Sequence, residues 1–161
     1  MFIMRKIVVA FLIALLIPLY MTAQNSVESN IDELDWFQKF EKAEKFSKNK
    51  NKPMLIFFTG SDWCGPCKKL EKDFFSSSEF KTIADKEFVL YKADFPRNLD
   101  LVSDSQRESN IELKSKYKVS SYPTLVFVDN KGNILGSRKG YNLMRDTSYH
   151  FQLLKEVLNK I

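Results

Sequence analysis

The fold is decided by one stretch of the chain: Met54-Leu55-Ile56-Phe57-Phe58-Thr59, the turn Gly60-Ser61-Asp62, and then Trp63-Cys64-Gly65-Pro66-Cys67-Lys68. The first six residues are almost continuously apolar, which is typical of a central strand that is buried on both faces. After the turn, a helix is expected to begin near Cys64 and to run to about Phe75. The two cysteines therefore lie where a buried strand passes into a helix.

This position of the cysteine pair predicts redox chemistry. Cys64, at a helix N-terminus, faces unpaired backbone N–H groups and the positive end of the helix dipole, and both favour the nucleophilic thiolate. Cys67 lies about one turn further along the same face, at a separation compatible with a disulfide. We therefore expect Cys64 to attack and Cys67 to resolve. Gly65 permits a tight turn, and Pro66 fits the first helical turn, where its missing N–H costs nothing.

A Cys-x-x-Cys pair has three other uses: half of a metal site, a structural disulfide, or no chemistry at all. The chain has only two cysteines and one histidine, His150, so a closed zinc site lacks ligands and no metal is expected. A structural disulfide across so short a loop adds little stability, because loop-closure entropy grows with loop length. The strand-to-helix position favours the redox use, with the Cys64–Cys67 disulfide and no added cofactor. His150 is expected to be an ordinary residue of the last helix.

Apolar spacing on either side of the motif predicts alternating helices and strands. Further strands are expected over 88–94, 124–128 and 133–137. Further helices are expected to begin at Asn30 or Asp32, at Ser76–Ser78, at Ile111, and at Thr147 or Ser148. Residues 95–110 show no clear period and are interpreted as a surface insertion. This order predicts an α/β fold with a central mixed β-sheet flanked by helices on both faces.

Residues 1–23 are interpreted as a targeting segment. A basic start and an unbroken apolar run over 7–17 precede small residues that end at Ala23, which is the layout of a cleaved secretory signal peptide. An uncleaved N-terminal anchor is the alternative, because Met21 fits a cleavage site poorly. In either case we expect residues 24–161 to form a single domain that is secreted across the inner membrane into the periplasm.

Composition argues against a nucleic-acid partner. The chain has 161 residues and a net charge of +5, from 25 Lys and Arg against 20 Asp and Glu. Its lysines are scattered rather than gathered into a stripe or arm, which is the arrangement that phosphate binding favours. We expect a monomer that binds no nucleic acid.

Several stretches together resemble the thioredoxin superfamily: the strand before the motif, Trp63 to Lys68, Tyr122-Pro123-Thr124, and the hairpin through Gly132. The resemblance implies a thioredoxin fold over the mature chain and exchange with protein disulfides. It also implies that Pro123 is cis and faces Cys64, and that the backbone of Tyr122 pairs with the bound polypeptide. A packing role beside a turn is the alternative for Tyr122. The expected substrate-binding residues are Trp63, Gly65, Pro66, Tyr122 and Pro123.

One departure from the family concerns proton transfer. Phe58 stands where typical thioredoxins carry a buried aspartate, so the usual proton acceptor for Cys67 is missing. Glu71, two helical turns beyond Cys64 on the same face, is a candidate for that role. The stretch 67–72 also resembles the C-terminal thioredoxin-like domain of membrane thiol–disulfide interchange proteins, in which a glutamate at this spacing lies near the pair.

The alternative for Glu71 is a solvated glutamate that pairs with Lys68 or Lys72. Lys92 is expected to be an exposed lysine on its strand, although the family often places a lysine near the buried acid.

The sequence thus predicts a thiol–disulfide oxidoreductase of the cell envelope. The Gly65-Pro66 pair resembles reducing thioredoxins, so we expect a reductase that acts on disulfide-bearing polypeptides and takes electrons from a membrane partner. A disulfide isomerase is one alternative, because residues 121–124 also resemble isomerases. The alternative from another class is a non-catalytic module that holds polypeptides on the Tyr122–Pro123 surface and the 95–110 insertion.

Overall fold

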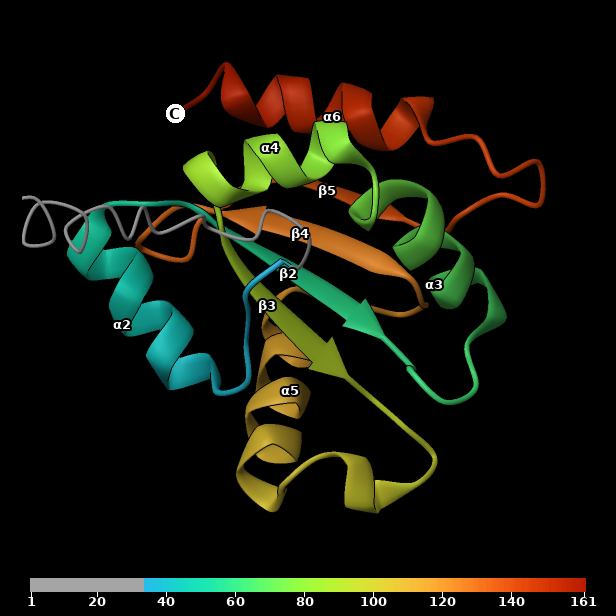
Figure 1. The fold of residues 1–161 in the computed structure, drawn as a ribbon. Coiled ribbons are helices and arrows are strands. Elements are labelled where there is room, and N and C mark those ends of the chain that lie inside the picture. The colour runs from blue at the N-terminus through green and yellow to red at the C-terminus, as the bar shows by residue number, and fades with distance from the viewer. Residues whose placement is uncertain (1–33) are drawn as a thin grey trace, which may run out of the picture. The chain divides into compact units, whose positions relative to one another are not determined.

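A computed structural model describes residues 34–161 (Figure 1). The targeting segment expected over 1–23 lies outside these residues. The strands are β1 (Trp36–Phe37), β2 (Met54–Thr59), β3 (Val89–Asp94), β4 (Thr124–Val128) and β5 (Ile134–Lys139). The helices are α2 (Phe40–Lys50), α3 (Gly65–Leu70), the π-helical turn η1 (Glu71–Phe75), α4 (Ser78–Glu87), the 3₁₀ turn η2 (Leu99–Leu101), α5 (Asp104–Lys116) and α6 (Ser148–Leu158).

The strands form one mixed sheet in the order β1-β3-β2-β4-β5. β3 is parallel to β1 and β2, whereas β4 is antiparallel to β2 and β5. The strands predicted over 54–59 and 124–128 are confirmed to the residue, and the other two differ only at their ends. None of the helices within residues 34–161 is long and apolar enough to cross a membrane.

Helices cover both faces of this sheet (Figure 1). The helical segments α3, η1, α4 and α6 lie on one face, and α2 and α5 lie on the other. β2 supplies side chains to both layers, because successive residues of a strand point to opposite faces. Leu55 and Phe57 belong to the first layer and Ile56 and Phe58 to the second, and all four are fully buried. The predicted α/β class with a mixed sheet covered on both faces is confirmed.

A helix was predicted to begin at Asn30 or Asp32. Among the described residues this prediction is wrong for 34–39, which precede the first helix. Trp36 and Phe37 form the edge strand β1 instead, paired with Leu90 and Tyr91 of β3. Trp36 packs against the first layer and Phe37 against the second. Adjacent residues reach opposite layers in a strand but not in a helix. The helix α2 begins only at Phe40.

The insertion predicted over 95–110 is partly helical. α5 begins at Asp104 rather than at Ile111, and Ser103 and Gln106 form a capping box at its start. Its inward face includes Asn110, which is 1% exposed and receives a 2.6 Å hydrogen bond from the Tyr91 hydroxyl. Asn110 in turn donates to the Asp94 carbonyl at 2.8 Å. Because a buried asparagine interrupts the apolar period of this helix, the sequence pattern did not indicate a helix before Ile111.

The helix predicted from Cys64 to Phe75 changes its winding after Leu70. η1 is π-helical, and the Ser76 N–H donates to the Glu71 carbonyl at 3.0 Å. The wider turn lets the consecutive residues Phe74 and Phe75 both enter the first layer, where they are 0% and 4% exposed. It also changes the direction in which residues beyond Leu70 point relative to the cysteines.

His150 gives the fold a testable dependence on pH. It lies in α6 between Phe74 and Tyr141, with 3% of its surface exposed. Burial and the nearby charge of Arg138 lower its pKa from 6.5 to about 4. The unfolded chain therefore binds a proton that the folded chain does not, so the free energy of unfolding falls as the pH drops from 6.5 to 4. We expect a loss of about 2 to 3 kcal/mol between neutral pH and about pH 4.5.

Urea unfolding of the wild type and of His150→Phe at several pH values measures this loss. The phenylalanine keeps a ring between Phe74 and Tyr141 but cannot take up a proton. Its free energy of unfolding is expected to stay nearly constant over this range. An equal loss in both proteins would contradict the assignment to His150.

Candidate active site

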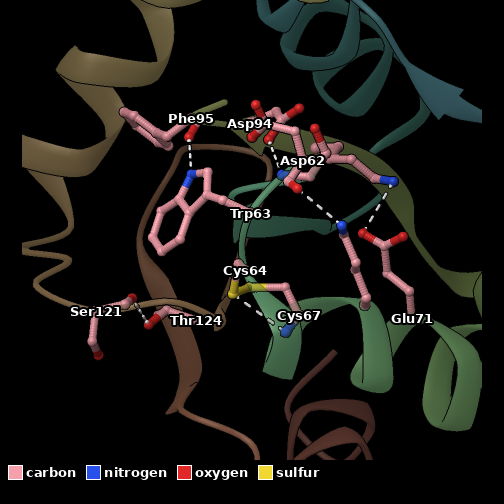
Figure 2. The surroundings of a disulfide bond; sticks show 12 residues. Asp62, Trp63, Cys64, Cys67, Glu71, Asp94, Phe95, Ser121 and Thr124 are labelled. Atoms are coloured by element: carbon pink, nitrogen blue, oxygen red, sulfur yellow. Dashed lines mark hydrogen bonds and ion pairs between the residues drawn. A yellow bond between two sulfur atoms is a disulfide. The ribbon is translucent and has the colours of Figure 1, made fainter. Parts of the chain in front are cut away.

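The two cysteines form a disulfide at the start of α3 (Figure 2). Their Cα atoms are 5.3 Å apart. Cys64 is the N-cap residue of α3, and its sulfur accepts a 3.3 Å hydrogen bond from the Cys67 backbone N–H. Cys64 is 3% exposed, whereas Cys67 is fully buried. Of the two residues, Cys64 is slightly the more exposed, and its sulfur has the backbone donor that stabilises a thiolate.

The turn before the disulfide is fixed by Gly60. Its carbonyl accepts hydrogen bonds from the N–H of Cys64 at 2.8 Å and of Trp63 at 3.2 Å. The indole of Trp63 folds back over Gly60, so that a Cβ added there would lie 2.4 Å from Trp63 Cε2. Only glycine leaves room for this ring. Trp63 is 39% exposed, and its Nε1 donates to the Phe95 carbonyl at 2.9 Å.

Tyr122 and Pro123 lie in the loop before β4, next to the disulfide. The peptide bond between them is cis, and Thr124 Oγ1 closes the loop by donating to the Ser121 carbonyl at 2.8 Å. Figure 2 shows Thr124 between Ser121 and Cys64 in this view. The Pro123 carbonyl accepts from Gly140 N–H at 2.7 Å. Within residues 34–161, neither backbone polar group of Tyr122 has a hydrogen-bond partner, so both remain available to an extended polypeptide.

Asp62 ties the start of the 95–110 segment to the active-site turn. Its carboxylate accepts the backbone N–H groups of Arg97 at 3.0 Å and of Asn98 at 2.9 Å. The bond from Asn98 is the main cause of a lowered pKa of Asp62. Asp94 makes a similar contact by accepting from Ser61 N–H at 2.8 Å. No local sequence pattern identifies Asp62 as a site residue, because its contacts are with residues 35 and 36 positions further along the chain.

Glu71 forms an ion pair with Lys92 in this structure. Its carboxylate lies 3.4 Å from Lys92 Nζ, and Figure 2 shows it on the side of α3 away from the disulfide. Both residues line a cavity of about 240 Å³ on that side. Lys68, one of the two partners considered for Glu71, instead donates to the Asp62 carbonyl. Lys92 is half-buried rather than exposed, and its ammonium lies 5.5 Å from the Trp36 ring centroid.

The position of the missing buried aspartate is filled by apolar packing. Phe58 is fully buried in the second layer and pairs with Ala93 of β3. The next residue, Thr59, has a buried hydroxyl without a hydrogen-bond partner in the described part of the chain. No group of three or more His, Cys, Asp or Glu side chains in residues 34–161 is arranged to hold a metal ion.

Comparison with known proteins agrees with this geometry. A family model described as thioredoxin-like matches residues 35–130. The disulfide bond reductase DsbH of Chlamydia pneumoniae is 41% identical over 108 residues, which are 67% of this chain and 63% of that protein. The thioredoxin-related protein DsbJ of the same organism is 29% identical over 148 residues, which are 86% of this chain and 41% of that protein. The chain thus spans less than two thirds of the length of either relative.

A solved structure of a DsbH oxidoreductase superimposes with a TM-score of 0.69 at 32% identity, covering 84% of this chain and 92% of that one. The fold, the strand-to-helix position of the disulfide and the match over residues 35–130 agree with one another. The chain belongs to the thioredoxin-like family and carries a Cys-x-x-Cys redox module.

Proposed function

We propose that this protein is a thiol–disulfide oxidoreductase that reduces disulfides of polypeptides in the cell envelope. The observation that carries the proposal is the difference between the two cysteines. Cys64 is the N-cap of α3, where its sulfur accepts the Cys67 backbone N–H, and it is 3% exposed, whereas Cys67 lies within the helix and is fully buried. The unpaired backbone groups of Tyr122 and the exposed ring of Trp63 lie around this pair and suit a bound polypeptide.

The reaction cycle follows from this arrangement. In the reduced protein, the Cys64 thiolate attacks one sulfur of a substrate disulfide, and the other substrate sulfur leaves and takes up a proton. Cys67 then loses its proton and attacks the Cys64 sulfur of the mixed disulfide, which releases the second substrate thiol. Two electrons pass from the protein to the substrate. The Cys64–Cys67 disulfide present in the structure is the product state of this cycle.

Each turnover requires two electrons from a donor that reduces the Cys64–Cys67 disulfide. We propose a membrane partner for this step, because the signal-like segment over 1–23 would carry the domain out of the cytoplasm. The protein would then act in the periplasm, either free or held by an uncleaved N-terminal anchor. Its similarity to a protein named disulfide bond reductase favours reduction over isomerisation as the direction.

Substitution of each cysteine tests the cycle. Cys64→Ser is expected to lower insulin reduction to background, because the attacking thiolate is lost. Cys67→Ser is expected to accumulate a mixed disulfide on Cys64, because nothing resolves it. Gel shift under non-reducing conditions, reversed by dithiothreitol, measures the trapped species. Reduction that persists in Cys64→Ser would contradict the proposed chemistry, and polypeptide binding without any reduction by the wild type would favour a binding module.

Glu71→Gln tests the second proposed role, proton transfer from Cys67. Glu71 takes this role only if its carboxylate leaves Lys92 and turns toward Cys67 in the reduced protein, and the variant is then expected to slow disulfide exchange at neutral pH by about tenfold, because a general base is lost. The rate should recover at alkaline pH, where Cys67 loses its proton without help. Glu79→Gln, which removes the same charge from an exposed position of α4, is the matched control. Equal rates for wild type and Glu71→Gln at every pH would reject the role.

A further inference from the structure

The segment that follows β3 contributes directly to the surface beside the disulfide. Phe95 stacks on Tyr122 with ring centroids 5.3 Å apart, and Tyr122 meets Trp63 edge-on at 5.9 Å. The three rings therefore form one aromatic platform, defined as Trp63, Phe95 and Tyr122. The start of the insertion is held against the active-site turn by Asp62 and by Trp63 Nε1. The platform thus combines residues from the turn, the insertion and the cis-proline loop.

Two cations lie over this platform. The Arg97 guanidinium carbon is 5.2 Å from the Trp63 ring centroid. The Lys114 ammonium is 5.3 Å from the centroids of both Phe95 and Tyr122. Neither cation has a carboxylate partner within salt-bridge distance among residues 34–161. Cation–π contacts hold such groups in place while their charge remains available to a ligand.

Three carboxylates of the same region are already bound. Asp62 accepts the backbone N–H groups of Arg97 and Asn98, and Asp94 accepts that of Ser61. Asp104 pairs with Arg107. These bonds orient the carboxylates but leave their negative charge, and the charge of Arg97 contributes to the lowered pKa of Asp62. The platform presents two cations that form no ion pair with a carboxylate of residues 34–161. The two cations lie beside the site where a substrate chain would pair with Tyr122.

We propose that Arg97 and Lys114 select polypeptide disulfides that carry acidic side chains next to the reacting cysteine. This inference rests on the proposed function and names its substrate class. A substrate strand along the Tyr122 backbone would point alternate side chains toward the platform. A carboxylate there would meet the guanidinium of Arg97, which can bind it in a two-point fashion, or the ammonium of Lys114.

The test uses three synthetic peptides that differ only beside a single cysteine, with two Glu, two Gln or two Lys residues. The cysteine is joined in a mixed disulfide to 2-thiopyridine, a neutral leaving group with a measurable absorbance. Each rate constant with the reduced protein is divided by the rate constant of the same peptide with dithiothreitol, a neutral small thiol. This ratio removes differences in the intrinsic reactivity of the peptides.

The normalised rate is expected to be about tenfold higher for the Glu peptide than for the Gln peptide at low salt, and lowest for the Lys peptide. Added salt should reduce this preference, because it screens exposed charges. The double variant Arg97→Gln, Lys114→Gln is expected to lose the preference. Arg97→Lys in the presence of Lys114 should retain most of it. Lys155→Gln, which removes one exposed charge from α6, is the matched control and should keep the wild-type preference.

The outcomes separate this inference from the proposed function. A protein that reduces all three peptides with equal normalised rates supports the function and overturns the selection of acidic substrates. A preference that survives in the double variant, or that is lost equally in Lys155→Gln, also overturns it. A protein that reduces none of the peptides, and does not reduce insulin, fails the proposed function itself.

Discussion

The burial of β2 on both faces of the sheet is the constraint on which the active site depends. Alternate residues of this strand enter two apolar layers, so the strand cannot shift along its axis without exposing large side chains. Its end therefore has a fixed position. The carbonyl of Gly60, directly after the strand, accepts the N–H groups of Trp63 and Cys64. The packing of the core thereby fixes the position of Cys64 through these hydrogen bonds.

The same burial defines the proton chemistry of the site. At the position where the resemblance to thioredoxins implies a buried acid, this strand has Phe58, packed in the second layer. The ion pair between Glu71, the first residue of the π-helical turn, and Lys92 lies on the side of α3 away from the disulfide. Charge is thus kept out of the core behind the disulfide and placed at the border of a small cavity. A proton that leaves Cys67 has no buried carboxylate on β2 to receive it.

The parts of the fold that sequence predicts well are those whose signal is local. The continuous apolar runs of β2 and β4 gave correct boundaries, and Ser77 caps α4 as its serine cluster indicated. β1 was missed because two adjacent aromatic residues fit a helical pattern as well as a strand. The start of α5 was predicted too late in the chain because Asn110, a polar residue, occupies a core position. For the site, Cys64 and Cys67 were identified from their own motif. Asp62, Phe95 and Arg97 were not, since their roles arise from contacts between distant parts of the chain.

The contacts of Asp62 and Trp63 with residues 95–98 bear on how such chains can diverge. Two neighbouring side chains of the catalytic turn hold three backbone groups of the insertion: the carbonyl of Phe95 and the N–H groups of Arg97 and Asn98. Those backbone groups exist whatever the side chains of the insertion are, so residues such as Arg97 are free to vary. Asp62 and Trp63, whose side chains make these contacts, cannot vary in the same way. On the proposed role of Arg97, single substitutions in this segment would change the substrate preference. Transfer of the segment to a relative would require the residues at 62 and 63 to be transferred with it.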